Sequence, residues 1–237
     1  MSFKPFQVDL PITEIIDEVK SKLASGNRLI VNAPPGAGKS TILPLALFEE
    51  KWLEGQKIIL LEPRRLAARS IAYRMAQLLD EPVGQTVGYR IRFETRVSEQ
   101  TKIEVVTEGI LTRMLQSDNA LEGVGLVIFD EFHERSLHAD LALALSLEAQ
   151  QVLRTDLRLL VMSATLNMPE LETLLKAPAV VSQGKQYPVS IQYTGETDQY
   201  MIPELAARVI LQAFREQSGD ILAFFPGEGE IRKCEEL

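Results

Sequence analysis

Short apolar runs alternate with longer helix-like stretches along most of this chain, and this alternation limits the possible folds more than any other feature. The runs are rich in Ile, Leu and Val and lie at residues 28–32, 57–61, 103–106, 126–129 and 159–162. Most of them are continuously apolar, which is typical of strands buried on both faces of a parallel sheet. The sequence therefore predicts an α/β domain with a doubly wound, mostly parallel sheet.

The segments between these runs show helical periodicity. From Ile12 to Leu23 apolar residues recur at spacings of three and four, behind Pro11 and ahead of Gly26, which predicts an amphipathic helix. Further helices are predicted at about residues 39–50, 66–79, 108–115, 140–153 and 169–175. These helices would cover the two faces of the sheet.

Composition excludes several classes of protein. With 46% hydrophobic and 24% charged residues in 237, the chain is unlike collagen, low-complexity or wholly disordered proteins. Its single cysteine, Cys234, allows neither an internal disulfide nor a four-thiolate zinc site. Residues 1–10 lack the pattern of a secretory signal, and no uncharged apolar run approaches the ~18 residues that span a bilayer. We therefore expect a cytoplasmic protein without a membrane partner.

The texture of the sequence changes near residue 184. Residues 184–199 are rich in Gly, Gln, Thr and Tyr and contain one alternating, strand-like piece, Val189 to Tyr193. Beyond them we predict a helix at 203–217, a strand from Ile221 to Phe225 and the beginning of a helix at Gly227. About 36 such residues cannot enclose a core of their own. We expect a first domain at 1–185, a connector at 186–200, and the start of a second α/β domain at 201–237.

A glycine-rich segment between the first predicted strand and a helix resembles a phosphate-binding loop. It reads Ala33-Pro34-Pro35-Gly36-Ala37-Gly38-Lys39-Ser40-Thr41. In such a loop backbone N–H groups surround phosphate oxygens, a lysine binds the terminal phosphates, and a hydroxyl binds Mg²⁺. Lys39 and Ser40 have the residue types for the last two roles, although Ala33 replaces the usual first glycine. The alternative is a glycine-rich turn that only caps a helix, and the strand–loop–helix context argues against it.

Two acids end the apolar run at residues 126–129. Because ligands bind at the carboxyl ends of strands in open parallel sheets, Asp130 and Glu131 would face the phosphate-binding loop. Asp130 would hold Mg²⁺, and Glu131 would polarise the attacking water. In isolation such a pair is more simply a surface turn, but its combination with Lys39 and Ser40 favours the catalytic interpretation.

Several segments together resemble the DEAH-box branch of superfamily 2 helicases. Residues 130–135, Asp-Glu-Phe-His-Glu-Arg, resemble its motif II, with Phe132 in place of the usual alanine, a variant typical of bacterial HrpB-type ATP-dependent helicases. Four more segments resemble other motifs in the family's order: Leu61 to Ala68 (motif Ia), Thr107 to Gly109 (Ib), Ser163 to Thr165 (III) and Phe225 to Ile231 (IV). The resemblance thus covers essentially the whole chain.

The resemblance implies a RecA-like P-loop NTPase lobe, followed by the truncated start of a second RecA-like lobe. It implies an enzyme that hydrolyses ATP with Mg²⁺ and uses the energy to translocate on or unwind nucleic acid. The implied partners are single-stranded or duplex RNA, or DNA, and the second lobe of the enzyme's own full-length chain. The implied residues are Gly36, Ala37, Gly38, Lys39, Ser40, Thr41 and Arg74 for the nucleotide; Arg64, Arg65 and Thr107 for nucleic acid; and His133, Ser163 and Thr165 for coupling. In the family, a second-lobe motif supplies arginines that these 237 residues lack, so we expect nucleotide binding with very slow hydrolysis.

Arginine distribution gives independent support for a nucleic-acid surface. The chain as a whole carries a formal charge of −8, but residues 64–96 contain seven arginines and three acids, a local excess of four. Arg65 and Arg69 lie four apart on a predicted helix, where like charges repel, and a phosphate backbone would offset that repulsion. The alternative is a solvated helix face with salt bridges, for example to Glu62.

Two other functions remain open from the sequence. One is a P-loop ATPase that remodels a protein partner without nucleic acid, and the other is a non-catalytic nucleotide-binding scaffold. A zinc site at His133 and His138 is disfavoured, because a spacing of five places the two rings poorly on one helical face.

Overall fold

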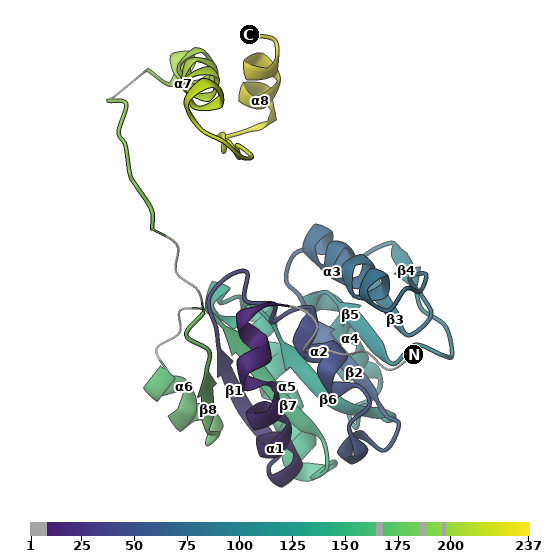
Figure 1. The fold of residues 1–237 in the computed structure, drawn as a ribbon. Helices are drawn as coiled ribbons and strands as arrows, with labels where there is room; N and C mark the ends of the chain where they lie inside the picture. Colours follow the sequence, from purple (N-terminus) through teal and green to yellow (C-terminus); the bar gives the residue numbers. More distant parts are fainter. Residues whose placement is uncertain (1–8, 165–167, 185–187, 196–197) are drawn as a thin grey trace. The chain divides into compact units, whose positions relative to one another are not determined.

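The computed structural model describes residues 9–164, 168–184, 188–195 and 198–237. The chain divides into two compact units, residues 1–186 and 187–237 (Figure 1).

The first unit contains an eight-stranded sheet. Its strands, in spatial order, are β4 (Glu94–Arg96), β3 (Val87–Ile91), β5 (Ile103–Val106), β2 (Lys57–Leu61), β6 (Val124–Phe129), β7 (Arg158–Ser163), β1 (Arg28–Asn32) and β8 (Ala179–Val181). All neighbouring pairs are parallel except β3 and β4, which form an antiparallel hairpin. The predicted doubly wound, mostly parallel sheet is confirmed.

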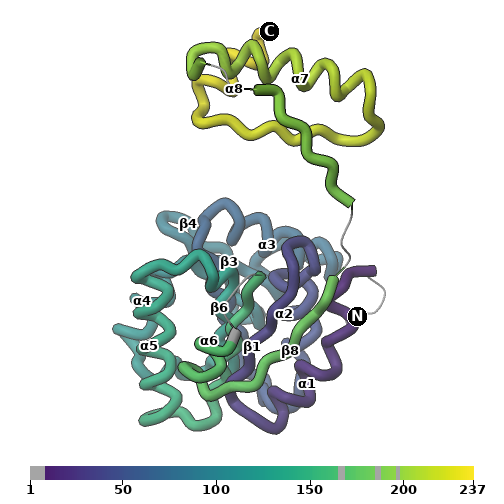
Figure 2. Tube along the Cα trace, turned by 90° about the vertical axis from the view of Figure 1, so that its left-hand side faces the viewer, coloured from purple at the N-terminus to yellow at the C-terminus, as the bar shows by residue number. Residues whose placement is uncertain are grey.

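Helices cover both faces of this sheet, as Figures 1 and 2 show from two directions. One face packs against α1 (Ile16–Ser25), which continues the 3-10 turn η2 (Pro11–Ile15), and against α2 (Ile42–Leu47) and α3 (Arg65–Leu78). The other face packs against α4 (Glu108–Ser117), α5 (Leu137–Val152) and α6 (Met168–Leu175). Shorter 3-10 turns are η3 (Lys51–Leu53) and η4 (Phe132–Glu134).

The two covered faces explain why the strands are continuously apolar. In β2, Ile58 and Leu60 belong to one buried cluster, and Ile59 and Leu61 belong to the cluster on the opposite face. Successive side chains of a strand point to opposite faces, so a strand buried on both sides needs an apolar residue at every position. Burial of each such side chain contributes about 1.5–3 kcal/mol of hydrophobic free energy.

Three strands at or near the two edges of the sheet were not predicted from the sequence, and one predicted helix is shorter in the structure. Strands β3, β4 and β8 are short or mix polar with apolar residues; β3, for example, places Gly88 and the half-buried Arg90 between its buried apolar residues. The helix predicted at 39–50 forms only as α2, because Gly38 adopts a left-handed φ of 95° and the helix begins at Ile42.

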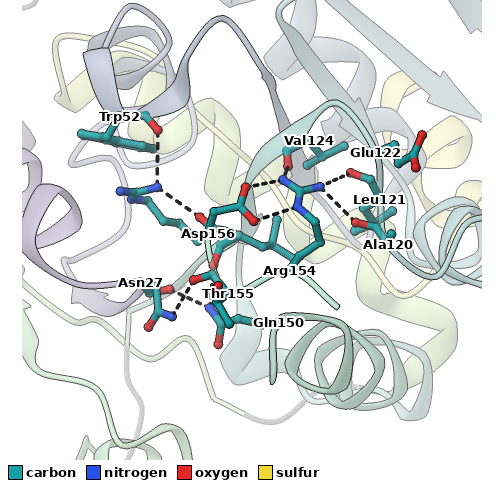
Figure 3. Close-up of polar contacts among 12 residues, drawn as sticks. Asn27, Trp52, Ala120, Leu121, Glu122, Val124, Gln150, Arg154, Thr155 and Asp156 are labelled. Carbon is teal, nitrogen blue, oxygen red and sulfur yellow. Dashed lines mark hydrogen bonds and ion pairs between the residues drawn. The ribbon is translucent and has the colours of Figure 1, made fainter. Parts of the chain in front are cut away.

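A polar network closes the opposite end of the sheet, before the strands β6 and β7 (Figure 3). Arg154 donates hydrogen bonds to the carbonyl oxygens of Ala120, Leu121 and Val124 at 3.0–3.1 Å, and its guanidinium pairs with Asp156 at 2.6 Å. One arginine thus satisfies the carbonyls of the turn that leads into β6. The network anchors the strand whose far end carries Asp130.

The second unit is helical in its described part. It contains η5 (Gln199–Met201), α7 (Ile202–Glu216) and α8 (Glu228–Glu235), so both helices predicted there are confirmed. The strand predicted from Ile221 to Phe225 is wrong, since these residues are irregular, and so is the strand-like piece from Val189 to Tyr193. A strand needs neighbouring strands for its backbone hydrogen bonds, and the described residues of this unit include none.

The described residues include no helix that is both long and apolar enough to cross a membrane.

Candidate nucleotide-binding site

The carboxyl ends of five adjacent parallel strands bring the predicted site residues to one edge of the sheet. Strand pairing places Asn32 beside Ser163, Val161 beside Phe129, and Phe129 beside Leu61. This edge therefore brings together four segments: the loop that follows β1, the last residue of β7, and the acids after β6 and after β2. Thr107, which follows β5, lies next along it.

Two glycines shape the loop between β1 and α2. Gly36 and Gly38 have positive φ values of 75° and 95°, which L-residues with side chains rarely adopt. A β-carbon on Gly38 would lie 3.0 Å from side-chain atoms of both Leu10 and Ile12. The backbone N–H of Ala33 donates to the carbonyl oxygen of Ser163 at 3.0 Å, so the phosphate-binding loop and the end of β7 are joined directly.

Lys39 lies buried inside this loop. Its ammonium donates to the carbonyl oxygens of Ala33 at 2.8 Å and Pro34 at 3.3 Å, and only 4% of the residue is exposed. Carbonyl oxygens are weaker partners for an ammonium than phosphate oxygens are. The loop therefore holds this cation where an anionic ligand would exchange with the two carbonyls.

Asp130 connects the end of β6 to the phosphate-binding loop. Burial raises the pKa of its carboxyl to about 6; the Ser40 hydroxyl opposes this effect, the Glu131 carboxylate adds to it, and the Glu131 N–H and the Lys39 ammonium lower the pKa. Oδ1 accepts the Glu131 N–H at 2.9 Å, whereas Oδ2 is buried and accepts no hydrogen bond from the described residues. A buried carboxylate oxygen without a donor, close to a serine hydroxyl, suits the oxygen coordination of Mg²⁺.

Glu131 has an unusual backbone conformation. Its φ of 48° and ψ of 35° are left-handed, and it caps the 3-10 turn η4. Its carboxylate is 28% exposed and lies 3.2 Å from Nδ1 of His133. A left-handed non-glycine residue costs of order 1–3 kcal/mol, and such residues cluster at functional sites. This carboxylate follows the buried Asp130 directly and is partly open to solvent.

A third acid, Glu62, belongs to the same edge, although the sequence analysis gave it no catalytic or binding role. It is 3% exposed; burial raises its pKa to about 7, a hydrogen bond from the Arg64 N–H acts against the rise, and Asp130, Glu131 and Glu134 add to it. Glu62 follows an apolar run as abruptly as Asp130 does. That pattern, applied to every strand, would have found it.

The residues expected to contact nucleic acid lie along the same edge. Arg64 caps α3 and pairs with Glu134; it does not form the side-chain salt bridge to Glu62 considered from the sequence, although its backbone N–H donates to that carboxylate at 3.1 Å. Arg65 is exposed on the first turn of α3. Thr107 is 9% exposed and caps α4 through its backbone.

The basic region of residues 64–96 is only partly available to a ligand. Arg90 bonds Glu104 at 2.7 Å, and Arg69 lies 3.9 Å from Glu94. Other arginines of the region are exposed: Arg65, Arg74, Arg92 and Arg96. The interpretation as a solvated, salt-bridged surface therefore holds for part of this set.

Some predicted site residues are not brought to the loop. Arg74 lies exposed on α3, where its guanidinium donates to Gln77 at 2.9 Å, and among the described residues no hydrogen bond or ion pair joins it to the loop. Thr165 lies outside the described residues. Within the described ranges, His, Cys, Asp and Glu form no group of three or more suited to a metal.

Comparisons with known proteins agree with this geometry. Residues 13–174 match the family described as DEAD/DEAH box helicase. The chain is 50% identical to the ATP-dependent RNA helicase HrpB of Escherichia coli (strain K12) over 228 residues, which are 96% of this chain and 28% of that protein. It is 38% identical to the ATP-dependent RNA helicase HrpA of Borreliella burgdorferi, covering 94% of this chain and 28% of that protein.

A crystal structure of the E. coli DEAH/RHA helicase HrpB matches the fold with a TM-score of 0.84 and 48% identity, over 96% of this chain and 29% of that one. The chain thus spans less than a third of the length of these relatives. The family match covers more than half of the chain, including the phosphate-binding loop and the acids after β6. From these matches we conclude that the chain belongs to the DEAD/DEAH box helicase family, with its similarity to HrpB extending over nearly all of its length.

Proposed function

We propose that this chain binds ATP with Mg²⁺ at the edge described above and, in its full-length protein, couples ATP hydrolysis to movement along RNA or DNA. One observation carries the proposal: the buried Lys39 ammonium in the loop after β1 and the buried Asp130 carboxylate after β6, whose Oδ2 accepts no hydrogen bond from the described residues, lie at the same carboxyl end of the sheet. The relatives named as ATP-dependent RNA helicases favour RNA as the nucleic acid.

The loop would bind the triphosphate through its backbone and one cation. Gly36, Ala37 and Gly38 form the turn that leads to α2, and Thr41 caps that helix. Their backbone N–H groups would bind phosphate oxygens, for which the Ala37 N–H would leave the Pro34 carbonyl oxygen that it bonds at 3.2 Å. On nucleotide binding, the Lys39 ammonium would exchange the carbonyl oxygens of Ala33 and Pro34 for phosphate oxygens. We assign Arg74 to the adenine by family resemblance alone.

Ser40 and Asp130 would hold Mg²⁺, whose chemistry there is to neutralise charge on the phosphate oxygens. Glu131 would orient and polarise the attacking water, since its carboxylate is partly exposed beside the buried Asp130. We propose that His133, Ser163 and Thr165 couple the nucleotide state to the rest of the motor. The hydrogen bond from Ala33 to the Ser163 carbonyl supports this role for motif III.

Nucleic acid would bind through its backbone phosphates at Arg64, Arg65 and Thr107. The two arginines lie at the start of α3, which follows β2, and Thr107 begins α4, which follows the neighbouring strand β5. Backbone contacts of this kind position a strand without reading its bases. We further propose that residues 201–237 begin a second lobe whose remainder completes the hydrolytic site.

Nucleotide binding by the Lys39→Ala variant tests the ATP site. Titration of a fluorescent ATP analogue should show Mg²⁺-dependent binding to the unsubstituted chain and a loss of at least tenfold in affinity for Lys39→Ala, because a charge-assisted phosphate contact contributes about 1.5–3 kcal/mol. Lys51→Ala, which removes an exposed lysine, is the control and should bind normally. Unchanged affinity in Lys39→Ala would contradict the assignment and favour a different site.

Salt-dependent binding of single-stranded RNA tests the nucleic-acid surface. The double variant Arg64→Ala, Arg65→Ala should bind more weakly and should flatten the slope of log affinity against log salt by about 0.7 for each lost phosphate contact. The control variant Lys176→Ala, Arg215→Ala removes two exposed cations elsewhere and should leave both the RNA affinity and its salt dependence unchanged. Equal binding by the two double variants would favour an ATPase that acts on a protein partner.

A further inference from the structure

The loop that joins β6 to α5, residues 130–136, is tied at two points to segments that we assign to nucleic acid. One tie reaches the start of α3 and the other reaches the start of α4. The same loop carries Glu131, the proposed hydrolytic carboxylate. An event at either helix start can therefore reach the catalytic turn through side chains that touch.

The first tie is the ion pair between the Arg64 guanidinium and the Glu134 carboxylate. Glu134 closes the 3-10 turn that Glu131 opens, because its backbone N–H donates to the Glu131 carbonyl at 2.9 Å. The side chain of Glu134 thus contacts Arg64, while its backbone N–H bonds the carbonyl oxygen of Glu131, the residue with the left-handed conformation.

The second tie is a hydrogen bond between the neutral Ser136 hydroxyl and the Glu108 carboxylate, and it is less exposed than the first. The Ser136 hydroxyl donates to the Glu108 carboxylate at 2.5 Å and accepts the N–H of Ala139 at 2.9 Å, which caps α5. This contact anchors the far end of the loop between α4 and α5. The loop is therefore held at residue 136 by a partly buried hydrogen bond and at residue 134 by an exposed ion pair.

The Arg64–Glu134 pair is weak enough to be exchanged. The arginine side chain is 70% exposed and that of Glu134 is 32% exposed, so water screens the pair. A nucleic-acid phosphate presents the same chemistry as the Glu134 carboxylate, namely anionic oxygens for a planar guanidinium. A phosphate bound at Arg64 and the Glu134 carboxylate would also repel each other, because both are anions.

We propose that Glu134 and a nucleic-acid phosphate compete for Arg64, so that nucleic-acid binding releases Glu134 and loosens the turn that orients Glu131. The proposal rests on the function assigned above to Arg64. Glu134 is then a positioning residue that links the nucleic-acid site to the nucleotide site. Thermodynamic linkage makes this effect reciprocal, so a nucleotide that changes the conformation of the turn also changes the affinity for nucleic acid.

Two measurements on the 237-residue chain test this link. The first is the affinity for a single-stranded RNA oligonucleotide at fixed salt. Glu134→Gln should bind RNA about two- to fivefold more tightly, since the free energy of an exposed ion pair no longer opposes binding. The gain should vanish in an Arg64→Ala background. Glu172→Gln, which removes an exposed negative charge on α6, is the matched control and should leave RNA affinity unchanged.

The second measurement is the factor by which saturating RNA changes the affinity for Mg²⁺ and an ATP analogue. In Glu134→Gln this factor should move toward one, which a residue that only stabilises the fold would not produce. Unchanged RNA affinity in Glu134→Gln, an equal gain in the Arg64→Ala background, or an unchanged coupling factor would each overturn the link. If Arg64→Ala alone leaves RNA binding intact, the function proposed for Arg64 fails instead, and the two failures are distinguishable.

Discussion

Two buried carboxyls define the chemistry of the site at the scale of single residues. Asp130 and Glu62 end neighbouring strands, and burial raises the pKa of the first to about 6 and of the second to about 7. Asp130 was predicted from the sequence because it ends an apolar run next to Glu131. Glu62 received no such role, since its neighbours in sequence, Pro63 and Arg64, suggested a nucleic-acid motif, and only the fold places it among the other acids.

The raised pKa of Glu62 predicts how stability depends on pH. An ordinary glutamate titrates near 4.5, so the folded state holds this proton more tightly than the unfolded chain does, and stability is lost as pH rises through about 7. Glu62→Gln should remove this loss and stabilise the fold by about 1–2 kcal/mol at pH 8 but not at pH 4.5. Urea unfolding at the two pH values measures the difference; lower stability of the variant at pH 8 would show that the ionised carboxylate is needed.

The raised pKa of Asp130 predicts pH-dependent nucleotide binding. Only the ionised carboxylate would bind Mg²⁺, so affinity for Mg²⁺ with an ATP analogue should fall as pH drops below about 6. Titrations between pH 5 and 8 measure this fall. Because the phosphates of the nucleotide also titrate, Asp130→Asn is the control, and it should bind weakly with a flatter pH profile. Parallel profiles for the two proteins would exclude Asp130 as the titrating group.

At the scale of secondary structure, burial decided which elements could be predicted. Strands β1, β2 and β5 have the bounds expected from their apolar runs, because both faces of each are largely covered. Strands β3, β4 and β8 lie at or near the edges, where polar residues interrupt the pattern. The strand expected at 221–225 failed for a related reason: apolar residues predict a strand only where neighbouring strands exist.

The end of the sheet opposite the nucleotide site depends on one arginine. Arg154→Ala should destabilise the first unit by about 2–4 kcal/mol, because the carbonyls of residues 120, 121 and 124 lose their donor. Urea unfolding followed by circular dichroism measures this loss, and Arg113→Ala, which removes an exposed arginine of α4, should change stability by less than about 0.5 kcal/mol. Equal small effects of both substitutions would show that water replaces the guanidinium.

For the whole molecule, we expect this chain to bind nucleotide but to hydrolyse it very slowly. We assign the loop after β1 and the acids after β6 to a motor lobe, and these 237 residues include no arginine-rich segment like the one that the family's second lobe is expected to supply. An arginine finger contributes roughly 10³ to 10⁵ in rate in related NTPases. Steady-state phosphate release by this chain should therefore be very slow with or without RNA. Brisk RNA-stimulated hydrolysis would contradict the expectation that hydrolysis needs arginines from the second lobe.

A crystal structure of the chain with Mg²⁺ and a non-hydrolysable ATP analogue tests the central claim most directly. We predict that the Lys39 ammonium will have left the carbonyl oxygens of Ala33 and Pro34 for the terminal phosphates, with the metal between the Ser40 hydroxyl and the Asp130 carboxylate. A triphosphate bound elsewhere, or a Lys39 still bonded to those two carbonyls beside a bound nucleotide, would contradict the assignment of this edge as the nucleotide site.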